Sequence, residues 1–180
     1  EAGAPEFKSL RAKGESHPIE TVGRELHPQI DVFWTGPEII SREITAEHVT
    51  RMTALFRRPP VIWDNLHAND YDGRRFYCGP YCGRPESLRT IVRGILSNPN
   101  CEFPLNYVGL RTLAGFANGK GTWDPRAAYL QAVEAWWQRF RTTGAPVSLE
   151  DLLLLTDCYY LPYCEGDKAR ELYGLARRLL

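Results

Sequence analysis

The chain has 180 residues, of which 43% are hydrophobic and 12% are aromatic. Such a chain can bury a sizeable core, which argues against disorder and favours one globular domain, or one with a small annex. Basic and acidic residues number 22 each, so the formal net charge is zero and no basic surface for a polyanion is indicated. We therefore expect a neutral ligand and no nucleic-acid partner.

The sequence gives no sign of a membrane span or of a disulfide framework. Its longest apolar run, residues 152–155, is far shorter than the roughly 20 residues that a membrane-spanning helix needs, so we expect a soluble protein without a membrane partner. Five cysteines at irregular spacing fit reduced thiols, and Cys78 and Cys82 lack a second ligand pair for zinc. We expect no metal and no cofactor.

The first elements along the chain form one strand, helix, strand unit. Residues 30–36 mix alternation with β-branched and aromatic side chains, which predicts a strand. Thr45 can cap a helix over residues 46–58, which must end at Pro59 and Pro60. A buried strand is predicted at residues 61–63. This order is typical of a βαβ unit.

The same alternation continues, and then the chain changes character. Residues 90–96 are predicted to form a third strand, and residues 106–116 the helix after it. We therefore expect residues 1–118 to be α/β, with residues 1–20 as a loop or linker, and residues 119–180 to be all helical.

Three helices are predicted in the second part. Asp124 and Pro125 mark the start of the first, whose buried stripe is predicted at Tyr129, Val133, Trp136 and Phe140. Ser148 and Asp151 resemble a capping box that opens a helix through residues 152–160. The last helix is predicted to carry a stripe of Leu172, Leu175, Ala176 and Leu179.

Polar side chains follow the second and third predicted strands. The apolar run of residues 61–63 gives way to carboxylates and carboxamides, among them Asn65 and Asp70, and Asn98 follows the next strand. In parallel α/β architectures ligands bind beyond the carboxyl ends of the strands. Trp63, Asn65, Asp70 and Asn98 would then share one cavity, in which neutral polar groups outnumber charges, as in a sugar pocket.

Each of these residues also has a purely structural interpretation. Trp63 alone would more often belong to a core, and Asn98 before a proline could be only a turn residue. Asp64 and Asp72 could be solvated loop acids, which we favour for Asp72. His67 is expected to be structural rather than a catalytic base, and the oxygen ligands of residues 65–72 match no EF-hand loop.

Four short segments together resemble a known family. They are Trp34-Thr35-Gly36-Pro37, the run from Val61 to Asp72, Gly79-Pro80-Tyr81 and Asn98-Pro99-Asn100-Cys101-Glu102. In this order they resemble the second half of the catalytic barrel of family 84 glycoside hydrolases, the O-GlcNAcase-type β-N-acetylglucosaminidases. Leu149 to Leu152 and Tyr160 to Tyr163 resemble the helical stalk that follows that barrel.

The resemblance implies a fold and a mechanism. The fold would be the C-terminal part of a (β/α)8 TIM-type barrel, followed by an all-α stalk segment. The reaction would be a retaining hydrolysis in which the substrate's own acetamido oxygen attacks the anomeric carbon. Asp70 would accept hydrogen bonds from the sugar 4- and 6-hydroxyls, and Asn98 would hold the 6-hydroxyl. Trp63 would wall the acetamide pocket, with Asn65 near its floor.

One departure from the family pattern limits what the resemblance implies. The family's chemistry uses two adjacent aspartates, yet no Asp-Asp pair occurs here, and the adjacent acids Glu150 and Asp151 fall in the first turn of a predicted helix. We therefore expect this chain alone to be inactive, with no catalytic residue among those present.

The expected partners follow from the same resemblance. They are a GlcNAc-bearing substrate, in the first instance an O-GlcNAc protein, the missing amino-terminal half of the barrel, and a second copy in a homodimer. The alternative is a non-catalytic GlcNAc-binding or scaffolding module that dimerises through its helices. Reduced cysteines favour the cytoplasm or nucleus, although bacterial relatives of this fold can be exported.

Overall fold

The computed structural model describes residues 18–140 and 143–179. The chain divides into two compact units: residues 1–64 with 83–96 form the first, and residues 65–82 with 97–180 form the second. No helix in the described part of the chain is both long and apolar enough to cross a bilayer.

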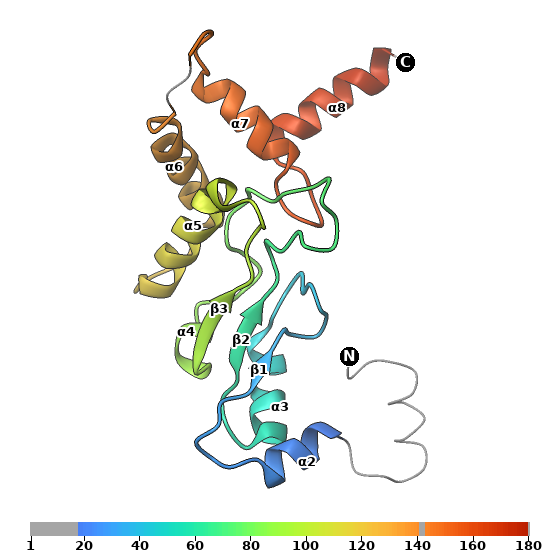
Figure 1. Cartoon of the computed structure of the whole chain (residues 1–180), viewed down its shortest axis with the longest axis vertical. Helices are drawn as coiled ribbons and strands as arrows, with labels where there is room; N and C mark the ends of the chain where they lie inside the picture. The colour runs from blue at the N-terminus through green and yellow to red at the C-terminus, as the bar shows by residue number, and fades with distance from the viewer. Residues whose placement is uncertain (1–17, 141–142, 180) are drawn as a thin grey trace. The chain divides into compact units, whose positions relative to one another are not determined.

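A small sheet lies at the centre of the first unit. Its strands are β1 (Phe33–Trp34), β2 (Val61–Asp64) and β3 (Gly94–Ser97), in the spatial order β1-β2-β3 (Figure 1). β1 and β2 run parallel, with Phe33 opposite Val61 and Trp34 opposite Ile62. Parallel neighbours require a crossover connection, and α3 supplies it.

Three helices accompany this sheet: α2 (Pro18–Glu25), α3 (Ala46–Phe56) and α4 (Leu88–Ile91). The hydroxyl of Thr45 accepts a hydrogen bond from the backbone N–H of His48 at 3.1 Å, which caps α3 as predicted. α3 ends at Arg57 in a left-handed conformation, two residues before the Pro59-Pro60 pair. Trp34 packs edge-on against Phe56 of α3, with ring centroids 5.6 Å apart.

The second unit is helical. It contains the 3-10 helix η1 (Phe103–Asn106) and the helices α5 (Tyr107–Asn118), α6 (Pro125–Trp137), α7 (Leu149–Cys158) and α8 (Asp167–Leu179). Successive helices pack on one another, α5 on α6, α6 on α7 and α7 on α8 (Figure 1). Their shared core consists of buried residues from α5, α6, α7 and the loop before Gly79, namely Cys78, Val108, Tyr129, Ala132, Val133, Trp136 and Leu152.

The predicted caps of α6 and α7 are confirmed. The carboxylate of Asp124 accepts a hydrogen bond from the N–H of Ala127 at 3.0 Å, with Pro125 as the first residue of α6. Ser148 and Asp151 form a reciprocal capping box at the start of α7.

Several predicted boundaries were wrong. Residues 18–20 belong to α2 rather than to a loop, while residues 1–17 lie outside the described part of the chain. Of the strand predicted over residues 30–36, only residues 33–34 form a β-strand. Residues 88–91 form α4, so the third strand begins at Gly94 rather than at Thr90.

The predicted apolar stripes are only partly buried. Tyr129, Val133 and Trp136 are buried as expected, but Phe140 follows the end of α6 and is 36% exposed. On α8 Leu172 and Leu175 are exposed, and Ala169 is buried instead. Leu172 and Leu175 of the predicted stripe are therefore only partly covered by the described part of the chain. The architecture as a whole is α/β with a small sheet and many helices, as the predicted class requires.

Candidate polar site after the strands

Asn65 and Asn98 meet in the second unit, directly after β2 and β3. The side-chain amide of Asn98 donates a hydrogen bond to the side-chain oxygen of Asn65, with the two atoms 3.1 Å apart. Asn65 is buried and Asn98 is half-buried. The structure therefore brings together two of the four residues for which the sequence predicts a role in sugar binding.

A second contact between the same two loops comes from Asn69, which is 2% exposed. Its side-chain oxygen accepts from the N–H of Cys101 at 2.8 Å. Its amide group donates to the backbone oxygen of Arg75 at 2.8 Å and to the carboxylate of Glu102 at 2.7 Å. One buried carboxamide thus closes residues 69–75 into a turn and joins that turn to the loop that follows β3.

A third contact joins the far ends of these loops. Asn100 accepts a hydrogen bond from the N–H of Tyr77 at 2.7 Å and donates to the backbone oxygen of Tyr77 at 3.0 Å. Asn106 accepts from both the backbone N–H and the side-chain amide of Asn100, at 2.8 and 2.9 Å. We call the contacts made by Asn65, Asn69, Asn98, Asn100 and Asn106 the asparagine clamp.

Asp70 lies on the clamped loop with its side chain exposed. Within residues 18–140 and 143–179, its carboxylate accepts no hydrogen bond and forms no ion pair. Asp72 behaves differently, because hydrogen bonds from the side chain and backbone of Arg74 hold the pKa of its carboxyl below the ordinary value. Both observations are compatible with Asp72 as a loop acid and with Asp70 as an acceptor available to a ligand.

Trp63 belongs to the first unit. It lies on β2 with 38% of its surface exposed, and its ring is 5.5 Å from that of Phe33 on β1. The neighbouring residue Asp64 is buried and receives two hydrogen bonds from Arg84, so the alternative of a solvated loop acid is wrong for Asp64.

His67 is placed as a structural residue. Its Nε2 atom lies 2.9 Å from the backbone oxygen of Gly79, and the residue is 3% exposed. A Cβ at Gly109 would lie 3.2 Å from three atoms of the imidazole ring, so the helix backbone covers it closely. These contacts favour a role in packing.

The cysteines offer no ready metal ligand set. Burial raises the pKa of the Cys78 thiol to about 12, which keeps it protonated at neutral pH. No group of three or more His, Cys, Asp or Glu side chains suited to a metal ion occurs among the described residues.

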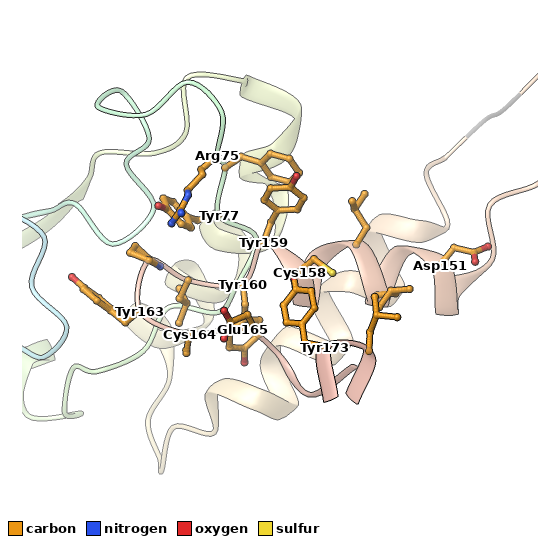
Figure 2. Close-up of a pocket in the computed structure, with 16 residues that line it drawn as sticks. Arg75, Tyr77, Asp151, Cys158, Tyr159, Tyr160, Tyr163, Cys164, Glu165 and Tyr173 are labelled. Carbon is orange, nitrogen blue, oxygen red and sulfur yellow. The ribbon is translucent and has the colours of Figure 1, made fainter. Parts of the chain in front are cut away.

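A separate cavity of about 750 Å³ lies in the second unit (Figure 2). Its lining is rich in aromatic rings, including Phe76 and Tyr159, which stack with centroids 4.0 Å apart. Tyr160, Tyr163 and Tyr173 also line it (Figure 2). None of Trp63, Asn65, Asp70 and Asn98 does, so the cavity and the polar site are different features.

Sequence reasoning missed the buried members of the asparagine clamp. Asn69, Asn100 and Asn106 have no local pattern that separates them from solvated loop residues, because their partners lie up to 33 residues away along the chain. The one available signal was the density of asparagine in residues 65–69 and 98–106, which exceeds what turns alone require.

Comparison with known proteins agrees with the motifs. A family model for β-N-acetylglucosaminidase matches residues 8–149. Protein O-GlcNAcase of Rattus norvegicus is 51% identical over 96 residues, which are 53% of this chain and 10% of that protein. The mouse protein matches equally. The chain therefore spans about a tenth of the length of these curated relatives.

Two solved structures share the fold. A mutant of the Thermobaculum terrenum O-GlcNAc hydrolase matches with a TM-score of 0.65 and 30% identity, over 78% of this chain and 29% of that one. CpGH84B matches with a TM-score of 0.70 and 19% identity, over 88% of this chain and 27% of that one. At this low identity the match supports a shared fold only. A stretch of 26 residues, 14% of this chain, is 85% identical to ketol-acid reductoisomerase of Renibacterium salmoninarum.

These matches place the chain among the glycoside hydrolases. Since the family model covers far more than half of it, the chain belongs to the β-N-acetylglucosaminidase family, and its likeness to O-GlcNAcases, expected from the motifs, is confirmed.

Proposed function

We propose that this chain forms the GlcNAc-binding side of a substrate-assisted, retaining β-N-acetylglucosaminidase that acts on O-GlcNAc proteins. The main supporting observation is the contact between Asn65 and Asn98, in the same unit as Asp70, whose exposed carboxylate has no hydrogen bond or ion pair among the described residues. Two carboxamides and one carboxylate are the groups that a polyhydroxylated, uncharged sugar requires.

Each residue has a distinct proposed role. Asp70 accepts hydrogen bonds from the sugar 4- and 6-hydroxyls, and Asn98 holds the 6-hydroxyl. Asn65 lies near the acetamido group. A carboxylate that binds two hydroxyls favours sugars that carry both, because each hydrogen bond to a charged group contributes about 1.5–3 kcal/mol.

The chemistry of bond cleavage needs groups that this sequence lacks. The sugar's acetamido oxygen acts as the nucleophile, so no enzyme nucleophile is required, but two carboxylic acids must polarise it and protonate the leaving group. No Asp-Asp pair occurs in the sequence. We propose that the other half of a (β/α)8 barrel supplies this pair, that residues 119–180 begin a helical stalk, and that the protein works in a reducing compartment.

Calorimetric titration of the chain with N-acetylglucosamine tests the proposed site. Asp70→Ala is expected to weaken binding at least roughly tenfold, because a hydrogen bond to a charged group is lost. Asp72→Ala is the matched control, since Asp72 is paired with Arg74 and is expected to leave the affinity unchanged. Equal affinities for wild type and Asp70→Ala would remove the site assignment.

Supplying the amino-terminal half of the barrel from a relative tests the enzyme. We expect hydrolysis of a chromogenic β-N-acetylglucosaminide by the complex and none by the chain alone. A folded complex without activity would favour the second candidate function.

That second candidate is a non-catalytic GlcNAc-binding or scaffolding module that dimerises through its helices. The exposed apolar residues Leu172, Tyr173 and Leu175 of α8 favour it, because clustered exposed apolar side chains mark interaction surfaces. Sedimentation at several concentrations tests the dimer, and Leu172→Glu with Leu175→Glu is expected to shift it to monomer. A concentration-independent monomer in wild type would exclude this candidate.

A further inference from the structure

We infer that Asn69 is a positioning residue that sets the orientation of Asp70 for the sugar 4-hydroxyl, an inference that rests on the proposed function. Asn69 immediately precedes Asp70 in the chain, is almost fully buried, and makes three side-chain hydrogen bonds of 2.7 to 2.8 Å. It does not need to touch the sugar itself.

The carboxylate of Asp70 depends on its backbone for its position. In the described part of the chain no side chain or backbone group bonds to it, so no contact of its own fixes where it points. The backbone around it is held on both sides by Asn69. The backbone oxygen of Asn69 accepts from the N–H of Asp72 at 3.0 Å, and its side-chain amide donates to the backbone oxygen of Arg75 at 2.8 Å, so both bonds close the turn that contains Asp70.

Both polar atoms of the Asn69 carboxamide are hydrogen-bonded. Its oxygen accepts from Cys101, and its nitrogen donates to Arg75 and Glu102. A carboxylate at this position would provide no donor and would face the acid of Glu102, and an alanine would leave the buried N–H of Cys101 without its partner. Asparagine alone holds both loops together with every polar atom satisfied.

The test compares the binding affinities of N-acetylglucosamine and 4-deoxy-N-acetylglucosamine. A separate NMR measurement reports the backbone mobility of Asp70. In wild type the parent sugar is expected to bind at least roughly tenfold more tightly than the deoxy sugar. In Asn69→Ala this ratio is expected to fall toward one, while affinity for the deoxy sugar changes little. The ¹⁵N order parameter of Asp70 is expected to drop from about 0.85 to below about 0.6.

Asn118→Ala is the matched control, because Asn118 is exposed on α5 and donates only to Ala114 within its own helix. It is expected to leave both the ratio and the order parameter unchanged. If Asn69→Ala does not fold, Glu102→Ala replaces it, because this change removes one exposed acceptor of the Asn69 amide. Glu102→Ala should lower the affinity ratio and the order parameter of Asp70, each by a smaller amount than Asn69→Ala would.

The outcomes separate the two proposals. Equal loss of affinity for both sugars, or an unchanged order parameter at Asp70, would overturn the role of Asn69. If wild type binds neither sugar, the proposed function fails, and the order parameter of Asp70 alone decides whether Asn69 positions that residue.

Discussion

Arg84 donates two hydrogen bonds to the carboxylate of Asp64, at 2.6 and 2.8 Å, and both side chains are almost completely shielded from solvent. The same guanidinium donates to the backbone oxygens of Ser41 and Arg42, each at 3.0 Å. The pair therefore fastens the end of β2 to the segment that follows β1. Its bidentate geometry suits arginine and not lysine.

Breaking this buried pair is expected to be costly. Asp64→Asn or Arg84→Met alone should reduce the free energy of unfolding by about 3–5 kcal/mol, because each leaves one charge or one set of donors buried without its partner. The double change Asp64→Asn with Arg84→Met should lose about 2 kcal/mol less than the sum of the two single changes. Urea unfolding followed by circular dichroism measures all three.

The control for this prediction is the surface pair of Asp72 and Arg74, whose arginine side chain is 91% exposed. Asp72→Asn is expected to produce no measurable change, since exposed ion pairs contribute little. Strictly additive losses at Asp64 and Arg84 would show that the two side chains do not act as a pair.

His48 gives the first unit a dependence on pH. Its Nε2 atom accepts a hydrogen bond from the indole N–H of Trp34 at 2.8 Å, which requires the neutral imidazole. Burial, and then the charge of Arg51, lower the pKa of His48 from 6.5. A base with a lowered folded-state pKa binds fewer protons when folded, so stability is complete above pH 6.5 and declines as the pH falls from 6.5 toward the folded pKa.

This prediction is checked by thermal unfolding between pH 8 and pH 5. Wild type should lose more stability over this range than His48→Gln, which keeps an acceptor for Trp34 but does not titrate. An NMR titration of the imidazole with a midpoint at or above 6.5 would contradict the proposed cause.

The parts of the fold that were predictable from sequence are those decided locally. Thr45, Asp124 and Ser148 each cap the helix that the sequence places after them, because a cap bonds to a backbone group three residues away. The local pattern also gave a wrong prediction at Thr90-Ile91-Val92. The β-branched residues of this run favour a strand, but bonds from residues 88–92 back to residues 85–88 fold it into one helical turn.

The candidate site was predictable only in the residues that directly follow the strands. Asn65, Asp70 and Asn98 follow apolar strands, and that placement is visible in the sequence. The buried amides of Asn69 and Asn100 hold their loops through contacts with residues 23 to 33 positions away, and no local pattern encodes such pairing.

The cap of α7 allows a smaller and cleaner test. The hydroxyl of Ser148 accepts from the N–H of Asp151 at 3.1 Å, and Asp151 accepts from the N–H of Ser148 at 3.0 Å. Ser148→Ala should therefore cost about 1 kcal/mol in urea unfolding, while Ser148→Thr, which keeps the hydroxyl that also donates to the Asp151 carboxylate, should retain most of the stability. Equal losses in both variants would mean that the cap hydrogen bond contributes nothing.

Gly166 is required by the space around it. A Cβ at this position would lie 2.2 Å from the carboxyl carbon of Asp157, which is fully buried, and the N–H of Gly166 donates to the backbone oxygen of Asp157 at 2.8 Å. Gly166→Ala should therefore lower the free energy of unfolding by about 1–3 kcal/mol, since neither group can move away. Gly174→Ala is the matched control, because the nearest atom to its Cβ, on the flexible side chain of Arg178, is 3.9 Å away. Gly174→Ala, inside α8, should raise the free energy of unfolding by about 0.5–1 kcal/mol. Chemical unfolding of both variants measures the two changes. A rise in the free energy of unfolding for both variants would contradict the close packing of Gly166 on Asp157.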